Sequence, residues 1–524
     1  MLDLGRTFLQ AVERNPNALA IVDGEVELTY SQWYAQIARF AAGLRSLGLE
    51  RGDRLIVVLQ NRWEMATLHW ACQFVGIVIV PVNWRAKPEE LDHTIADAGA
   101  TVVIYEPASA DAVITSEAAR TTMRIGLDQV EGATCSFEEL IATQEQGAAA
   151  LAPRPVASAD DYSVMLYTSG TTGLAKGVPR RHRHERAAAL AHVAQNLYRR
   201  GERTLGVMPL YHTMGVRSLL AMALVDGLFV CVRRWNASFA LHCIAKYGIT
   251  CLYLVPTLYH DLLAAPEFAR TENGSITKLG FAGAPMNDGL LKRCAAAFRP
   301  ELFVNHYGSS EVYTFSVDQD ATIKPGSAGR AGINTRLRVV NLDASSPEAL
   351  ARTGEEGQII AELAGDEAFE GYWKRPDANA KAIREGWYFT GDTGYLDADG
   401  DLYVTGRVDD MIISGGENIS PVDIESILSL HPAVDEVAVV GLKDERWGQK
   451  VVAFIKRSCA VDATALDEFC RTSDLVNFKR PREYIFVDAI PKSPVGKILR
   501  RKLSSGEYAR ENRAEDVQGA GKQI

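Results

Sequence analysis

The chain has 524 residues, and its 66 acidic and 56 basic side chains give a formal net charge of −10. This mild acidity argues against a protein that coats nucleic acids. Apolar residues make up 47% and charged residues 23%, and 43 glycines and 20 prolines are too few for a low-complexity or fibrous chain. One hydrophobic core stops growing at roughly 250–300 residues, so the length predicts at least two domains.

The cysteines and the apolar stretches indicate in which cellular compartment the protein is expected. Eight cysteines are scattered without a CxxC pair, which favours reduced, mostly buried thiols over disulfides or a zinc site. An acid, Asp3, stands where a secretory signal carries basic residues. The longest apolar stretches, such as residues 74–82, are far shorter than the ~20 residues that cross a bilayer. We therefore expect a cytoplasmic protein without a membrane span.

Short apolar strands alternate with helices over the first two-thirds of the chain. The expected strands are residues 54–59, 101–105, 204–208, 228–232, 250–255 and 279–282, with amphipathic helices such as residues 31–47 and 290–298 between them. This alternation predicts an α/β fold whose sheets are mainly parallel and covered by helices on both faces.

The pattern changes between residues 326 and 405. Short strands alternate there with Gly and Asp turns such as residues 397–400, which favours a small antiparallel barrel or sheet. We therefore expect an N-terminal domain of residues 1–408, made of doubly covered sheets plus a small β-barrel at about residues 326–405.

A second, smaller domain is expected to follow. Ser420 can cap a helix, Pro421 fits its first position and Asp423 complements its dipole. Residues 434–441 and 484–487 are typical strands, and residues 465–471 favour a helix. These elements predict a compact α+β domain over residues 410–503, followed by a polar tail of residues 504–524.

The segment of residues 167–177, YTSGTTGLAKG, concentrates groups that bind phosphate. Its glycines permit tight turns that aim backbone N–H groups at an anion, and its hydroxyls and Lys176 add donors. The spacing differs from a Walker loop, because Lys176 follows Gly173 by three residues and neither Ser nor Thr comes next. A flexible solvated loop is the alternative.

Four further segments follow in chain order: residues 307–311 (YGSSE), 387–392 (WYFTGD), 406–410 (GRVDD) and 491–497 (PKSPVGK). Together with the loop they resemble the acyl-adenylate-forming superfamily, which includes the acyl-CoA synthetases. Residues 408–419, 446–449 and 477–482 are similar to the benzoate-type CoA ligases, the 4-chlorobenzoate:CoA ligases among them. The resemblance implies an AMP-forming acid–thiol ligase that uses ATP, Mg²⁺ and CoA.

The resemblance implies roles in the first half-reaction, in which a carboxylate attacks the α-phosphate of ATP. Charge then accumulates on phosphoryl oxygens, which positioned cations and N–H groups stabilise. Lys497 is implied to bridge carboxylate and phosphate, Glu311 to hold magnesium, Tyr307 to stack on adenine, and Asp392 and Arg407 to contact the ribose. The other nucleotide-binding residues implied are Thr168, Ser169, Gly170, Thr171, Thr172, Gly173, Lys176, Gly283, Ala284, Pro285, Gly308, Ser309 and Ser310, the last in place of the usual Thr.

Each of these assignments has an ordinary structural alternative. Lys497 lies in a Pro- and Gly-rich turn and would then be a solvated surface lysine. Tyr307 would be a core aromatic residue, and Asp392 a turn residue.

The second half-reaction needs a different geometry, because Lys497 blocks the approach of the thiol. Asp409 matches the hinge about which the small domain of the family swings. Ser414, Gly415 and Gly416 are then implied to face the site. The CoA nucleotide is implied to lie near Arg85, Trp447, Phe478, Arg480 and Arg482, where rings stack and guanidinium groups pair with phosphates. A simple turn and a solvated basic face are the alternatives.

The acyl pocket is expected to be aromatic and shallow. By position it draws on His212, Thr213, Met214, Tyr253, His306, Val312, Tyr313 and Thr314. Such a lining suits a planar ring better than a long alkyl chain, and His306 and Tyr313 favour a hydroxylated, amino-substituted or heteroaromatic acid. His212 is assigned to gating or orientation, because the attacking carboxylate is already ionised. For His306, an ordinary pocket wall is the alternative.

Other functions remain open at this stage. A short- or medium-chain fatty acyl-CoA synthetase, a stand-alone adenylating enzyme that loads a carrier protein, and a catalytically silent nucleotide-binding protein are the alternatives. The basic run of residues 180–186 is interpreted as facing phosphates or solvent, because a nucleic-acid interface needs a broader basic surface. The expected partners are small molecules, with a homodimer left open.

Overall fold

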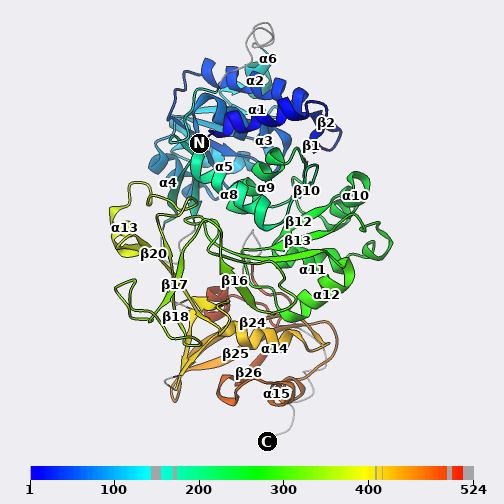
Figure 1. Ribbon diagram of the computed structural model, residues 1–524, viewed down its shortest axis with the longest axis vertical. Coiled ribbons are helices and arrows are strands. Elements are labelled where there is room, and N and C mark those ends of the chain that lie inside the picture. Colours follow the sequence, from blue (N-terminus) through cyan, green and yellow to red (C-terminus); the bar gives the residue numbers. More distant parts are fainter. Residues whose placement is uncertain are drawn as a thin grey trace, which may run out of the picture.

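A computed structural model describes residues 2–142, 155–168, 174–407, 410–415, 417–492 and 498–511. Within these ranges the strands form sheets of seven, fourteen and five strands. Figure 1 shows the three sheets following one another along the longest axis, with the C-terminal sheet at one end.

The seven-stranded sheet carries the start of the phosphate-binding segment. Its order is β7 (Cys135–Ser136), β6 (Met123–Gly126), β5 (Val102–Tyr105), β3 (Arg54–Val58), β4 (Val78–Pro81), β8 (Tyr162–Thr168) and β9 (Lys176–Arg181). All neighbours are parallel except β8 and β9, which form an antiparallel hairpin. Helices α1 (Leu4–Arg14), α2 (Tyr30–Ser46), α3 (Trp63–Val75) and α6 (Phe137–Ala142) cover one face, and α4 (Pro88–Ala98) and α5 (Ala110–Thr115) cover the other.

The alternation of side chains along β3 explains this double cover. Leu55 and Val57 point into the core built with α1 to α3, whereas Ile56 and Val58 point into the core built with α4 and α5. A strand whose two faces are both buried reads as one continuous apolar run, as residues 55–59 do. The prediction of doubly covered parallel sheets is confirmed.

The fourteen-stranded sheet has a parallel half and an antiparallel half. The parallel half contains β1 (Leu19–Asp23), β11 (Leu228–Cys231), β10 (Arg203–Gly206), β12 (Cys251–Leu254), β13 (Lys278–Phe281) and β14 (Leu302–Tyr307), with β2 (Val26–Thr29) antiparallel at its edge. Helices α10 (Ala237–Tyr247), α11 (Pro256–Ala264) and α12 (Asp288–Phe298) cover one face. Helices α8 (His182–Gln195) and α9 (Thr213–Leu224) pack between this sheet and the first.

The antiparallel half corrects the expected barrel. It continues from β14 through β15 (Ser316–Asp318), β16 (Ser327–Ala331), β21 (Leu402–Arg407), β20 (Trp387–Leu396) and β18 (Gly357–Glu362) to β17 (Leu337–Val340); β19 (Ile383–Arg384) pairs with β20 and α13 (Pro376–Ala382) precedes it. Among the described strands, no pairing closes β17 onto β16. The Gly and Asp turns therefore connect an open extension of the large sheet, and the barrel prediction is wrong.

The five-stranded sheet forms the C-terminal unit. Its order is β23 (Glu417–Ile419), β22 (Ile412–Ser414), β25 (Gly448–Arg457) and β24 (Val434–Asp444), with β26 (Glu483–Phe486) parallel to β25. Helices α14 (Pro421–Ser429) and α15 (Ala463–Thr472) pack on one face and α16 (Arg500–Ser504) on the other. Helix α14 begins at Pro421 as predicted, but the Ser420 hydroxyl donates to the Thr405 carbonyl instead of capping the helix.

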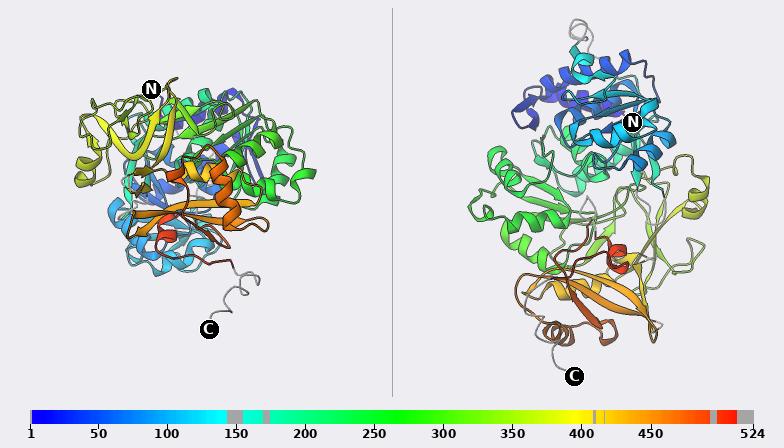
Figure 2. Two further views of the ribbon diagram at one scale, coloured as in Figure 1. Left: turned by 90° about the horizontal axis from the view of Figure 1, so that it is seen from below. Right: turned by 180° about the vertical axis from the view of Figure 1, so that it is seen from behind.

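The C-terminal unit packs against α11 and α12 (Figure 2). Gly289 of α12 lies against the backbone of Ser429, so close that a Cβ at residue 289 would be 2.5 Å from the Ser429 carbonyl oxygen. Nearby, His260 Nε2 of α11 lies 2.8 Å from Asp435 Oδ1 of β24. Lys456 also pairs with Asp435 at 2.6 Å, so the contact between the two units includes an ion-pair network.

This contact is expected to depend on pH. Hydrogen bonding to Asp261 and Asp435 raises the pKa of His260 above its ordinary value of 6.5. The charged His260 imidazolium therefore contributes fully to the stability of the folded protein below pH 6.5. This contribution is lost as the pH rises through the raised pKa of His260. We expect His260→Gln to lower the thermal midpoint at pH 6 more than at pH 8.5, by differential scanning fluorimetry. An equal effect at both values would contradict this prediction.

The cysteines and the helices agree with the sequence analysis. All eight cysteines lie in the described residues and are free, and six of them are buried. Burial raises the pKa of several, Cys251 to about 12, which keeps the buried thiols protonated. Within the described ranges, no helix is both long and apolar enough to span a membrane.

Candidate active site

The phosphate-binding segment is the loop of the β8–β9 hairpin. Thr168 at the end of β8 pairs directly with Lys176 at the start of β9, so the two strands hold the ends of the loop side by side. The loop residues Ser169, Gly170, Thr171, Thr172 and Gly173 lie outside the described residues, as do Asp409, Gly416 and Lys497.

Lys176 lies next to Glu311 in a partly enclosed space. Its Nζ is 4.0 Å from the centroid of the Tyr372 ring, and the Tyr372 hydroxyl donates to Glu311 Oε1 at 2.7 Å. Burial lowers the pKa of Lys176, and the Glu311 carboxylate opposes this shift. Sequence analysis did not assign Tyr372 to the site, because no motif surrounds this tyrosine in the sequence.

Tight turns hold the segment that carries Glu311. A Cβ at Gly308 would be 2.1 Å from the Tyr313 carbonyl oxygen, so only glycine fits there. The Ser309 hydroxyl accepts from the N–H groups of Glu311 and Val312 at 3.2 and 3.4 Å. Ser309 therefore stabilises the turn, and the Ser310 carbonyl accepts from Arg180.

Three more of the expected nucleotide-binding residues meet across the large sheet. The Tyr307 hydroxyl at the end of β14 donates to Asp392 Oδ2 at 2.6 Å. Arg407 Nε lies 3.2 Å from Asp392 Oδ1, because Asp392 and Arg407 are directly paired on β20 and β21. Gly283, with a φ of 81°, begins the turn of Gly283, Ala284 and Pro285 after β13.

Tyr388 connects the two groups of residues. Its hydroxyl lies 3.4 Å from that of Tyr372. Burial raises its pKa, and the negative charges of Glu311 and Asp392 add to the shift. The structure thus brings Lys176, Glu311, Asp392 and Arg407 into one electrostatically coupled region.

The basic run of residues 180–186 faces inward only in part. The side chains of Arg180, His182 and His184 are buried, whereas those of Arg181 and Arg183 stay partly exposed to solvent. Arg180 is fully buried, pairs with Glu185 at 2.8 Å and donates to the Glu311 and Glu367 carbonyls. Arg181 and Arg183 pair with Glu370. Burial lowers the pKa of His182 to about 4 and that of His184 to about 3. Carboxylates of the same chain therefore neutralise this run, and the histidines are neutral.

The residues assigned to CoA lie on two parts of the chain. Trp447 and Phe478 are exposed, and Gly415 packs so closely on the Trp447 ring that a Cβ would be 2.9 Å from it. Ser414 ends β22 in the adjoining hairpin, and Arg482 is exposed. Arg480 pairs with Asp467 at 3.0 Å. Arg85 follows β4 in the first sheet, where its guanidinium lies 3.9 Å from the Trp84 ring centroid.

The residues assigned to the acyl pocket divide into two groups. Met214 and Tyr253 pack together with Met208, Val255 and Ala282, and the Tyr253 and His306 ring centroids are 5.3 Å apart. His212 and Thr213 begin α9 beside Met214. Val312 instead packs with Phe315 and Phe369.

Tyr313 and Thr314 turn toward buried charges. Tyr313 donates to Glu185 at 3.1 Å, and its ring centroid lies 4.0 Å from the Arg180 guanidinium. Thr314 Oγ1 accepts from Arg217 at 2.7 Å. Sequence analysis missed Arg217, although a single charge in the otherwise uncharged helix α9, TMGVRSLLAMAL, was a visible signal.

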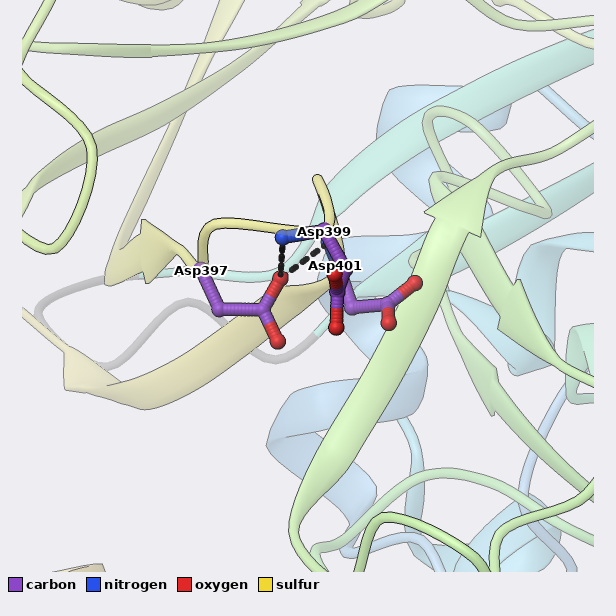
Figure 3. Close-up of side chains that lie close together, drawn as sticks. All are labelled: Asp397, Asp399 and Asp401. Atoms are coloured by element: carbon purple, nitrogen blue, oxygen red, sulfur yellow. Dashed lines mark hydrogen bonds between the residues drawn. The ribbon is translucent and has the colours of Figure 1, made fainter.

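A separate acidic cluster lies in the turn between β20 and β21. Figure 3 shows Asp397, whose Oδ1 accepts from the N–H groups of Asp399 and Asp401 at 2.9 and 2.8 Å. Lys324 Nζ lies 3.0, 2.6 and 2.5 Å from the carboxylates of the three residues. An ammonium group thus already neutralises this cluster.

Comparison with known proteins agrees with this geometry. The model of the AMP-binding enzymes matches residues 8–373, and the model of their C-terminal domain matches residues 423–497. The chain therefore belongs to the AMP-binding enzymes, the acyl-adenylate-forming superfamily. Within them it is an AMP-forming acid–thiol ligase of the CoA ligase family.

The most similar proteins include ligases for aromatic acids and for fatty acids. The 4-chlorobenzoate–CoA ligase of an Arthrobacter species is 34% identical over 94% of this chain and 93% of its own. A long-chain fatty-acid–CoA ligase of Mycobacterium tuberculosis is 32% identical over 96% of this chain and 98% of its own. The structure of an anthranilate CoA ligase with anthranoyl-AMP superposes with a TM-score of 0.88 at 25% identity, covering 96% of this chain and 97% of that one.

Proposed function

We propose that the chain joins a ring-containing carboxylic acid, aromatic or otherwise cyclic, to CoA through an acyl-adenylate. The observation that carries the choice of acid is the group formed by Met214 near the start of α9, Tyr253 of β12 and His306 of β14. The Tyr253 and His306 rings lie 5.3 Å apart at 77° to one another, and Met214 is buried. Such an aromatic lining suits a planar ring better than a long alkyl chain. The similarity to the 4-chlorobenzoate and anthranilate ligases supports this choice.

In the proposed first half-reaction the acid carboxylate attacks the α-phosphate of ATP and pyrophosphate leaves. Lys176, the loop N–H groups and Lys497 stabilise the charge that grows on the phosphoryl oxygens. Asp392 accepts hydrogen bonds from the ribose hydroxyls, and Arg407 holds the Asp392 carboxylate in place at 3.2 Å. Tyr307 and the turn of Gly283, Ala284 and Pro285 enclose the adenine.

Glu311 is proposed as the protein ligand for magnesium. Its carboxylate is buried, and its Oε1 accepts from Tyr372. This leaves Oε2 as a hard oxygen donor, the type of ligand that Mg²⁺ prefers. The ion, when bound, supplies positive charge that offsets the negative charge of the phosphates.

The second half-reaction is proposed to follow a swing of the C-terminal domain, residues 410–503, about Asp409. The swing removes Lys497 and brings the Ser414–Gly416 turn to the site, where the thiol of CoA attacks the acyl-AMP and AMP leaves. The exposed rings of Trp447 and Phe478 are proposed to stack on the CoA nucleotide, with Arg85, Arg480 and Arg482 near its phosphates.

Pyrophosphate release with a panel of acids tests the proposal. The panel contains benzoate, hydroxy- and aminobenzoates, furoate, cyclohexanecarboxylate and alkanoates of increasing length, each with ATP and Mg²⁺ and with or without CoA. We expect ring acids to have the highest kcat/KM and turnover to require CoA. Highest activity on alkanoates would contradict the ring pocket, and release unaffected by CoA would favour an enzyme that loads a carrier protein.

A further inference from the structure

Five buried polar side chains form a cluster that includes two residues of the proposed acyl pocket, Tyr253 and His306. His192 and Asn196 come from the end of α8, Arg217 from α9, Tyr253 from β12 and His306 from β14, and each is at most 2% exposed. The rings of His192, Tyr253 and His306 lie with centroids 4.7 to 5.3 Å apart. A Cβ at Gly280 would be 3.0 Å from the Tyr253 ring, so the backbone of β13 packs directly against one side of the cluster.

Hydrogen bonds within the cluster fix its orientation. Arg217 donates to the Tyr253 hydroxyl at 2.5 Å, to Thr314 Oγ1 at 2.7 Å and to the Tyr313 carbonyl at 3.3 Å. The Asn196 amide nitrogen lies 3.0 Å from His192 Nδ1 and 3.0 Å from His306 Nε2. The same amide nitrogen donates to the His192 carbonyl at 2.8 Å, and Asn196 Oδ1 lies 3.3 Å from His306 Nε2. Each neutral imidazole carries one hydrogen, so each ring can donate from one of its two nitrogens.

Three buried nitrogens of the cluster lack hydrogen-bond partners among the described residues. They are Arg217 Nε, His192 Nε2 and His306 Nδ1. A buried polar group left unpaired costs about 1–3 kcal/mol, and native structures contain few of them. Three in one cluster, on three different elements, give it hydrogen-bonding capacity that a ligand can complete.

The charge of the cluster favours an acceptor. Arg217 makes no ion pair with a described carboxylate; Glu367 and Glu185 act on it at longer range, and Glu185 is already paired with Arg180. Burial and the Arg217 charge lower the pKa of both His192 and His306, so the rings are neutral. A guanidinium, which can only donate, beside two neutral imidazoles suits a group that accepts hydrogen bonds.

We propose that this cluster binds a hydrogen-bond acceptor on the ring of the acid, remote from the carboxylate, and that Arg217 determines this specificity. The proposal rests on the proposed function, because it requires Tyr253 and His306 to line the acyl pocket. The favoured substrates are then acids whose ring carries an oxygen substituent or contains a heteroatom. A site that leaves its own donors unpaired discriminates strongly against the analogue without the acceptor.

Paired acids test the proposal on the full-length enzyme. We expect kcat/KM to be about 10- to 100-fold higher for hydroxybenzoates than for benzoate. The same ratio is expected for furoate compared with cyclopentanecarboxylate, which lacks the ring oxygen. Benzenedicarboxylates are added to the comparison, because their second carboxylate is a charged acceptor. Their kcat/KM relative to that of the hydroxybenzoates shows whether the cluster prefers a charged or a neutral acceptor. Arg217→Met is expected to bring these ratios close to one with the KM for ATP unchanged, and Arg217→Lys to retain part of the preference.

Two further variants separate recognition from structure. Ser218→Ala, on the same helix, removes only a hydroxyl that donates to the Met214 carbonyl and is expected to leave the ratios unchanged. His192→Phe keeps the ring packing, removes one unpaired nitrogen and is expected to reduce the preference even if Arg217→Met does not fold. Equal kcat/KM for paired acids in the wild type, or ratios unchanged in both His192→Phe and Arg217→Met, would overturn the inference while ring acids remain substrates. Exclusive turnover of alkanoates would instead overturn the proposed function.

Discussion

The Lys497→Ala variant is expected to lose about 100- to 1,000-fold of the rate of acyl-adenylate formation, because it removes a positioned cation from the reacting phosphate. The loss is expected in kcat more than in the KM for ATP, since the charge it stabilises grows only in the transition state. Pyrophosphate release in single-turnover experiments measures this step directly.

Two controls define what the loss means. Lys492→Ala removes the other lysine of the same segment, which pairs with Glu436, and is expected to leave the adenylation rate within about threefold of the wild type. Supplied acyl-AMP and CoA are expected to form the thioester at nearly the wild-type rate in Lys497→Ala. Equal losses in both half-reactions would show that Lys497 acts on folding or domain docking.

Arg180→Met is expected to destabilise the protein by about 3–5 kcal/mol, because it leaves Glu185 as an unpaired charge in the core. Both side chains are fully buried and lie 2.8 Å apart. Arg180 also donates to the carbonyls of Glu311 and Glu367, so adenylation is expected to weaken as well. The midpoint of urea denaturation measures the loss of stability.

The double variant Arg180→Met with Glu185→Leu tests the cause. Removing both charges avoids the unpaired carboxylate and is expected to recover a large part of the lost stability. Arg183→Met removes an ion pair on the surface and is expected to cost at most about 1 kcal/mol. A double variant no more stable than Arg180→Met would show that the hydrogen bonds to the two carbonyls dominate.

The sequence predicted the parallel half of the fold well, because strands buried on both faces leave uninterrupted apolar runs such as residues 55–59. It did not predict how the antiparallel strands join the large sheet. Short strands with Gly and Asp turns have the same sequence pattern in a barrel and in an open sheet. The structure distinguishes the two architectures, because β16 pairs with β15 on one side and with β21 on the other and so joins these strands to the large sheet.

The candidate site was predicted where a motif lies on one segment, as with Tyr307 and Glu311. It was missed where distant segments meet: Tyr372 reaches Glu311 across 61 positions, and Arg217 reaches Tyr253 across 36. The ion pairs of the basic run were missed for the same reason, because Glu370, which neutralises Arg181 and Arg183, lies 187 or more positions further along the chain.

The continuity of the fourteen-stranded sheet has a consequence for how such a molecule diversifies. Tyr307, Asp392 and Arg407 stand on β14, β20 and β21 of one hydrogen-bonded lattice, whereas His192 and Arg217 project from helices packed on it. Tyr253 and His306 of the same cluster stand on β12 and β14, so only the helical members can be exchanged without touching a strand of the sheet. Side chains on α8 and α9 are therefore free to vary while the strand pairing that holds Tyr307, Asp392 and Arg407 together is kept.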